Sequence, residues 1–131
     1  MSREELNPDG LVDATGIGYN QAIIEDGTLY MSGQVGWDEN FELAGDDIRS
    51  QTRKAFENVE ILLAEVDTSL ADVTKITAHI VDPHENRDGF FEVWNEFYPE
   101  QPYPCLTLLG PHQLAREGFL VELEVEVPIE E

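Results

Sequence analysis

Residues 119–127 read FLVELEVEV, the clearest strand pattern in the chain. Its apolar positions are Phe119, Val121, Leu123, Val125 and Val127, and the positions between them are Leu120, Glu122, Glu124 and Glu126. Because successive side chains of a β-strand point to opposite faces, one face of this strand is apolar and the other is largely acidic. The pattern predicts a strand with one face packed against the core of the protein.

Further strands are expected earlier in the chain, over residues 19–24, 28–35, 73–81 and 105–109. Asp26-Gly27 lies between the first two of them and is typical of a two-residue hairpin turn, because glycine accepts the positive φ that a type I′ turn needs. The first two strands are therefore expected to pair as a hairpin.

Two amphipathic helices are expected between the strands. The first begins after Asp46 and Asp47, whose charges suit a helix N-terminus, and runs to about Glu65. Its apolar stripe recurs at three- and four-residue steps and consists of Ile48, Thr52, Ala55, Val59 and Leu62. The second helix is expected to begin at Asp82-Pro83 and to end at Pro99.

These elements give the order β-β-α-β-α-β-β. Helices on one face of a mixed sheet make an α+β domain. The length of 131 residues fits one domain, so residues 1–131 are interpreted as a single unit. Residues 1–16 are polar and contain Pro8 and Gly10, and they are expected to form an irregular N-terminal arm.

The charge balance excludes some classes of partner. The chain has 28 Asp and Glu residues against 7 Lys and Arg residues, which gives a formal net charge of −21. Nucleic-acid binding needs clustered cations that neutralise phosphates, and only Arg49, Arg53 and Lys54 form a group here. Nucleic acids and anionic membrane surfaces are therefore not expected as partners.

Two explanations of the acidity remain open. One is a specific acidic function, such as binding a basic partner or metal ions. The other is adaptation to a cytoplasm with molar salt, where the screening length is about 3 Å. The acids are spread along the whole chain and only two lysines occur, which favours salt adaptation. This halophile hypothesis predicts that the fold loosens in dilute buffer.

The sequence also favours a cytoplasmic protein. The N-terminus lacks the apolar region of a signal peptide, and no apolar stretch reaches the roughly 18 residues of a membrane span. Cys105 is the single cysteine, which excludes an internal disulfide and a zinc site built from cysteines. His79, His84 and His112 show no metal-ligand spacing, so no metal is expected.

Five short motifs occur in one order and cover roughly residues 16 to 127. They are Gly18-Tyr19-Asn20-Gln21-Ala22, Leu29-Tyr30-Met31-Ser32-Gly33-Gln34, Gln51-Thr52-Arg53-Lys54-Ala55-Phe56-Glu57-Asn58, Asp72-Val73-Thr74-Lys75 and Leu120-Val121-Glu122-Leu123-Glu124. In order and spacing they resemble the motifs of the Rid/YjgF family, the reactive intermediate (imine/enamine) deaminases.

The resemblance implies a chorismate-mutase-like fold and a homotrimer with three clefts between subunits. In that family each cleft hydrolyses a reactive imine or enamine to a ketoacid and ammonia, and no cofactor is used. A glutamate of the last strand is thought to position the attacking water, and it matches Glu122. An arginine in a P-x-R motif holds the substrate carboxylate.

This sequence departs from the family at that arginine. Aligning Gly110 and the last strand puts the motif at Pro104-Cys105-Leu106, so that Leu106 stands in the place of the arginine. Arginine grips a carboxylate through a charged fork, whereas leucine offers no donor. The departure predicts a substrate without a carboxylate, or a weak residual activity. Arg116, in the turn before the last strand, is a candidate substitute; the alternative is an exposed arginine paired with Glu117.

The other candidate residues each have a structural alternative. Glu122 is either the water-positioning group or part of a solvated acidic face, where Glu124 and Glu126 would raise its pKa as like charges do. Tyr19, Ser32, Gly33 and Cys105 are expected to line the cleft, Gly33 because it allows close approach. Ser32 lacks the histidine and aspartate partners of a nucleophile, and Cys105 is otherwise a small structural residue.

Two functions from different classes follow from these residues. The first is a trimeric deaminase of imines or enamines. The alternative is a trimer that binds a small molecule or a protein without catalysis. A ribonuclease activity, sometimes attributed to the family, is disfavoured because the net charge of −21 repels RNA.

Overall fold

The computed structural model describes residues 3–129 and places the FLVELEVEV segment inside a mixed seven-stranded sheet. The strand order is β1-β2-β3-β7-β5-β6, and β4 also pairs with β7. The strands are β1 (Arg3–Leu6), β2 (Ala22–Glu25), β3 (Thr28–Met31), β4 (Gln34–Val35), β5 (Lys75–Ile80), β6 (Cys105–Leu109) and β7 (Val121–Pro128). Strands β5 and β6 are parallel, and the other pairs are antiparallel.

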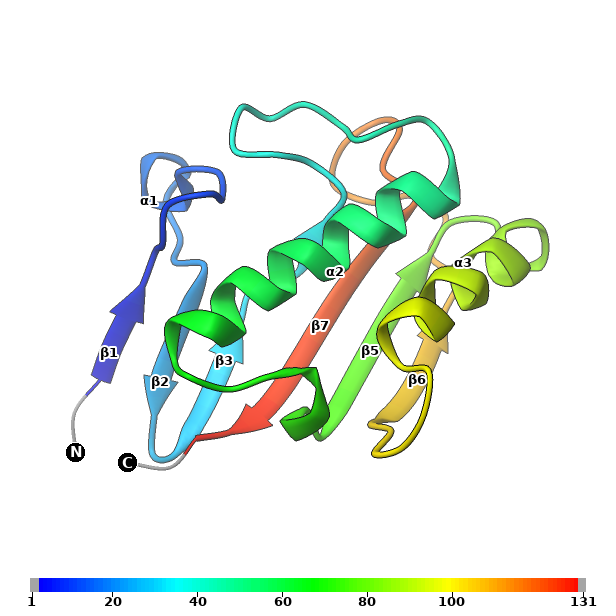
Figure 1. Ribbon diagram of the computed structural model, residues 1–131. Helices are drawn as coiled ribbons and strands as arrows, with labels where there is room; N and C mark the ends of the chain where they lie inside the picture. Colours follow the sequence, from blue (N-terminus) through cyan, green and yellow to red (C-terminus); the bar gives the residue numbers. More distant parts are fainter. Residues whose placement is uncertain (1–2, 130–131) are drawn as a thin grey trace.

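Two long helices, α2 (Ile48–Glu65) and α3 (Pro83–Phe97), lie side by side on one face of this sheet (Figure 1). The side chain of Asp47 caps α2 by accepting a hydrogen bond from the backbone N–H of Ser50, at 3.0 Å. The predicted α+β class and the two helices on one face are confirmed. No helix among residues 3–129 has the length and apolar character needed to cross a bilayer.

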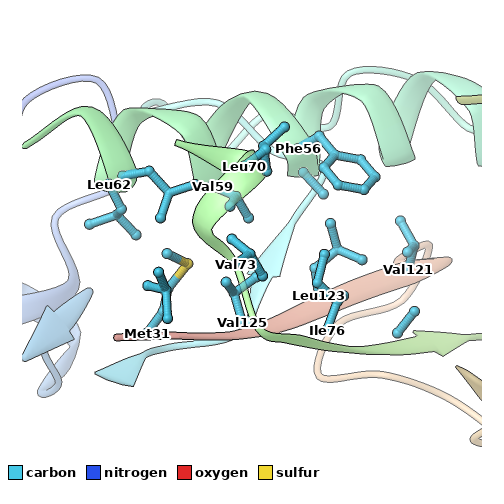
Figure 2. Packing of buried hydrophobic residues seen from close by; sticks show 14 of the residues in the cluster. Met31, Phe56, Val59, Leu62, Leu70, Val73, Ile76, Val121, Leu123 and Val125 are labelled. Carbon is cyan, nitrogen blue, oxygen red and sulfur yellow. The ribbon is translucent and has the colours of Figure 1, made fainter. Parts of the chain in front are cut away.

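The core lies between α2 and the sheet (Figure 2). Phe56 and Leu62 of α2 face Ile76 of β5 and Leu123 of β7, and all four side chains are fully buried. Burying a side chain of this kind stabilises the folded state by about 1.5–3 kcal/mol. The apolar alternation of β7 and the apolar stripe of α2 therefore meet in one cluster, which fixes the face of the sheet that the helices cover.

The opposite face, here called the open face, carries polar side chains. On β7 it presents the glutamates that alternate with the buried residues. The register of β5 and β7 pairs His79 with Glu122, Thr77 with Glu124 and Lys75 with Glu126. A carboxylate of β7 therefore has a polar neighbour on β5 at each step along this face.

The expectation of an irregular arm over residues 1–16 is wrong in part. Residues Arg3–Leu6 form β1, antiparallel to β2 at the edge of the sheet, and Ala14–Ile17 form one turn of helix, α1. Only Leu6 of β1 is buried. An edge strand tolerates charged residues on both faces, so the short charged segment lacks the alternation that identifies a half-buried strand.

The strand expected over residues 28–35 is divided into β3 and β4 by a bulge. Tyr30 pairs with Glu126 and Gln34 pairs with Leu123. Three residues, 31–33, therefore stand opposite two residues of β7. A bulge of this kind bends the strand and redirects side chains, and such bulges are frequent beside functional sites.

Candidate functional site

A cleft of about 270 Å³ opens beside the bulge, at the end of the sheet where β4 meets the start of β7. Its lining includes Tyr19, Gly33, Trp37, Arg116, Phe119 and Glu122. A larger hollow of about 680 Å³ lies elsewhere, beside Thr68 and Asp72. There the Thr68 hydroxyl donates a hydrogen bond to Asp72 at 2.9 Å. The smaller cleft is the candidate site, because it gathers a half-buried carboxylate, a phenol and a guanidinium.

Gly33 and Glu122 are in close contact at the centre of the cleft. A Cβ atom added to Gly33 would lie 2.6 Å from Cδ and 2.8 Å from Cγ of Glu122, closer than two such carbons can approach. Residue 33 must therefore be glycine for the Glu122 side chain to lie where it does. The bulge at residues 31–33 brings this glycine against the carboxylate.

Burial raises the pKa of Glu122, the nearby carboxylate of Glu124 raises it further, and the facing His79 lowers it. From the sequence, like charges along the strand were expected to raise this pKa. That attribution needs correction, because burial is the larger cause and Glu126 does not contribute. A carboxyl group with a raised pKa exchanges protons more readily near neutral pH, as a general acid or base requires.

Tyr19 follows helix α1 and contributes to the same cleft. Its backbone N–H donates to the carbonyl of Ala14 at 3.1 Å, which fixes the turn that presents the ring. The pKa of the Tyr19 phenol is raised by burial and by Glu122, and it is lowered by Arg116. The phenol therefore interacts electrostatically with both charged groups of the cleft.

Arg116 lies over two aromatic rings at the side of the cleft. Its guanidinium carbon is 5.1 Å from the centroid of Trp37 and 5.9 Å from the centroid of Phe41. The alternative of an ion pair with Glu117 is not found, and Arg116 forms no ion pair within residues 3–129. A guanidinium over a ring face gains about 0.5–2 kcal/mol of cation–π attraction.

Two buried amide side chains of α2 hold the loops around the cleft. Asn58 donates to the carbonyls of Val35 at 3.0 Å and Trp37 at 2.9 Å. Gln51 donates to the carbonyl of Gly118 at 2.9 Å and accepts from the N–H of Leu120 at 2.8 Å. Both amides lie within one of the family motifs, but no role was predicted for them. The signal in the sequence was the presence of two polar residues within an otherwise apolar helix stripe.

Three of the residues predicted to line the cleft do not line it in the single chain, namely Ser32, Cys105 and Leu106. The Ser32 hydroxyl donates to the carbonyl of Asn20 at 2.6 Å, which joins the segment after β3 to the segment before β2. Cys105 is exposed on β6, where it pairs with Lys75. Trp37 and Phe119, to which the sequence motifs assign no site role, do line it.

Leu106, which stands at the position of the family arginine, faces the core in the single chain. Leu106 pairs with Ile76, whose side chain is fully buried under the helices, and Leu106 packs against the same core. Alternation along β6 therefore turns Cys105 towards the open face and Leu106 towards the core.

Comparisons with known proteins agree with this fold. A family model described as endoribonuclease L-PSP matches residues 13–129. A RutC family protein of Pyrococcus abyssi is 35% identical over 107 residues, which are 81% of this chain and 82% of that protein. A 2-iminobutanoate/2-iminopropanoate deaminase of Dermatophagoides farinae is 28% identical over 113 residues, 86% of each chain.

Solved structures extend the likeness over nearly the whole chain. The protein YJGH superposes with a TM-score of 0.90 at 31% identity, covering 100% of this chain and 99% of that chain. RidA from a Psychrobacter species superposes with a TM-score of 0.85 at 29% identity, covering 96% of this chain and 99% of that chain. The Rid fold expected from the motifs is thereby confirmed, and the chain belongs to the Rid/YjgF family, whose family model is described as endoribonuclease L-PSP.

Proposed function

We propose that this cleft hydrolyses a reactive imine or enamine to a carbonyl compound and ammonia. The observation that carries the proposal is the Glu122 carboxyl, half-buried against Gly33 with a raised pKa and facing the same cleft as Tyr19. The similarity to a 2-iminobutanoate/2-iminopropanoate deaminase supports this reaction class.

The chemistry needs one water molecule and one proton-transferring group. The Glu122 carboxylate accepts a proton from water as the water oxygen bonds to the C=N carbon and the C=N π electrons move to nitrogen. The proton then passes to that nitrogen, which gives a carbinolamine. The Glu122 carboxylate next accepts the proton of the carbinolamine hydroxyl and delivers it to the amine, so that ammonia leaves as the C=O bond forms and the carboxylate is regenerated. A positioned group of this kind contributes about 10²–10⁴-fold to the rate. Tyr19 contributes a hydroxyl that orients the nitrogen.

The proposed working form is a homotrimer in which each cleft is completed by a neighbouring copy. The unpaired outer edge of β6, the strand that carries the exposed Cys105, supports this assembly. In the trimer Cys105 of one copy approaches the Glu122 cleft of the next. Light scattering in about 1 M KCl tests the assembly, and a monomer that hydrolyses imines at the full rate would contradict it.

The experiment couples an amino-acid oxidase or threonine dehydratase to the purified chain and follows the decay of the imine. Glu122→Gln is expected to lower the acceleration by about 10²–10⁴-fold. Glu126→Gln, four residues further along the same face, is the matched control and is expected to stay within about 3-fold of the wild type, since its side chain neither lines the cleft nor contributes to the raised pKa of Glu122. A wild-type chain that does not accelerate imine decay overturns the proposal and favours the non-catalytic binding alternative.

A further inference from the structure

Arg116 differs from every other arginine in the described chain. Arg3, Arg49, Arg53 and Arg87 each form an ion pair with a nearby carboxylate. Arg116 instead lies over Trp37 and Phe41, although the chain has 28 acidic residues. The protein therefore keeps one guanidinium away from its own carboxylates, and this guanidinium borders the Glu122 cleft.

Aromatic rings hold the cation without using its hydrogen-bond donors. A guanidinium has five N–H donors in a planar fork, and a ring face attracts its charge while accepting no conventional hydrogen bond. Arg116 makes no side-chain hydrogen bond to a carboxylate within residues 3–129. Its fork is therefore available to a ligand, and a planar carboxylate matches it through two parallel hydrogen bonds.

The loops that carry this arrangement are anchored from α2. Gln51 binds the backbone of Gly118 and Leu120 on the loop that bears Arg116, and Asn58 binds the carbonyl of Trp37. Both amide side chains are almost completely buried. The cation is thus presented by a fixed scaffold, which reduces the ordering cost of binding an anion.

We propose that Arg116 binds the carboxylate of the cleft's ligand and so selects imines that carry an adjacent carboxylate. This inference rests on the proposed function. Tyr19, Arg116 and Glu122 line the same cleft, so a ligand beside Tyr19 reaches the cation with one end and the acid with the other. The cleft volume of about 270 Å³ suits a small ligand. A monoanion is favoured over a phosphate dianion because Glu122 adds negative charge across the cleft.

The inference reverses the expectation drawn from Leu106. That expectation was a substrate without a carboxylate, because the aligned position lacks an arginine. Leu106 packs into the core and leaves the cleft to other residues. The cation comes instead from the loop before β7, which reaches the cleft from a different direction.

Binding tests the inference without any need for turnover. Calorimetric titration compares 2-oxobutanoate, the carbonyl product that retains the carboxylate, with butanone, which lacks it. Arg116→Gln is expected to weaken 2-oxobutanoate binding by about 10- to 100-fold, the effect of losing charged hydrogen bonds. The affinity of Arg116→Lys for 2-oxobutanoate is expected to lie between those of the wild type and Arg116→Gln. The affinity of both variants for butanone is expected to equal that of the wild type.

Arg87→Gln is the matched control. Arg87 also lies over an aromatic ring, 5.1 Å from the centroid of Phe91, but outside the cleft. The Arg87→Gln variant is expected to bind 2-oxobutanoate with the affinity of the wild type. Equal binding of 2-oxobutanoate by wild type and Arg116→Gln overturns the inference, and so does a site that prefers inorganic phosphate to 2-oxobutanoate.

Kinetics separate this inference from the proposed function. Arg116→Gln is expected to raise the KM for 2-iminobutanoate and to leave the hydrolysis of a carboxylate-free imine unchanged. If the wild type hydrolyses both imines and Arg116→Gln affects neither, the inference fails and the proposed function stands. If the wild type binds 2-oxobutanoate through Arg116 but accelerates no imine decay, the proposed function fails and the carboxylate site stands.

Discussion

The two faces of β7 differ sharply although their residues alternate one by one. Leu123 and Val125 are almost completely buried under α2, whereas Glu124 on the other face has a side chain that is 54% exposed. The helix-covered face holds the fold together, and the open face carries the titratable groups. One strand thus supplies both the stability of the domain and the chemistry of its candidate site.

The open face is itself uneven. Glu122 and Glu124 are two residues apart and belong to the same repeat in the sequence. Glu122 lies half-buried against Gly33, whereas Glu124 contacts His79 at the surface. The bulge at residues 31–33 causes this difference, because it brings a glycine backbone over one carboxylate and not over the next.

The largest expected effect comes from the helix-covered face. Leu123→Ala removes a fully buried side chain and is expected to lower the free energy of unfolding by about 2–5 kcal/mol. Urea denaturation followed by circular dichroism measures this. Glu124→Ala, one position away on the open face, is expected to change stability by less than about 1 kcal/mol. Similar losses for the two variants would contradict the division of β7 into two faces.

Gly33→Ala tests the bulge. The added methyl group would overlap the Glu122 side chain and displace the carboxylate. A displacement of about 1 Å costs roughly 10²-fold in rate, so imine hydrolysis is expected to fall by about that factor while the fold persists. In the double variant with Glu122→Gln, the Gly33→Ala change is expected to add little, since both act on one group. Fully additive losses would show that Gly33 acts apart from Glu122.

Most of the fold was predictable because its signals are local and repetitive. The alternation of β7, the stripe of α2 and the Asp26-Gly27 turn each follow from residues a few positions apart. Strand β1 escaped prediction because an edge strand needs no apolar face. The break between β3 and β4 escaped because it depends on the register with β7, which lies about ninety residues further along the chain.

The candidate site was predictable only in part, for the same reason. Tyr19, Gly33 and Glu122 lie within motifs, and the structure brings all three into one cleft. The environment of Arg116 depends on Trp37 and Phe41 from a distant loop, and no local pattern links them. Leu106 shows the converse, since its motif position was readable but the facing of its side chain was not.

A smaller effect than those of Leu123→Ala and Gly33→Ala is expected for Glu122→Gln, in the way that the stability of the protein depends on pH. The pKa of Glu122 in the folded chain is raised above the unfolded value, so the protonated form stabilises the fold, and this stabilisation is lost as pH rises through the folded pKa. Glu122→Gln is therefore expected to melt at a higher temperature than the wild type near pH 7.5, with a smaller difference near pH 5. Melting curves measured above the pI of about 4.1 test this. A difference that is constant with pH would contradict the raised pKa.

The smallest effect is expected two residues further along the face, and it has the opposite sign. Glu124 contacts His79 near the surface, and the pair attracts when His79 is protonated. Glu124→Gln is therefore expected to lose about 0.2–1 kcal/mol of stability in dilute buffer. In about 1 M KCl, where the screening length is about 3 Å, this loss should shrink towards zero. Replacing two neighbouring glutamates would thus stabilise the protein at one position and destabilise it at the other, because burial dominates at Glu122 and an exposed ion pair dominates at Glu124. A gain of stability in Glu124→Gln, matching that of Glu122→Gln, would mean that plain repulsion among the acids outweighs both local environments.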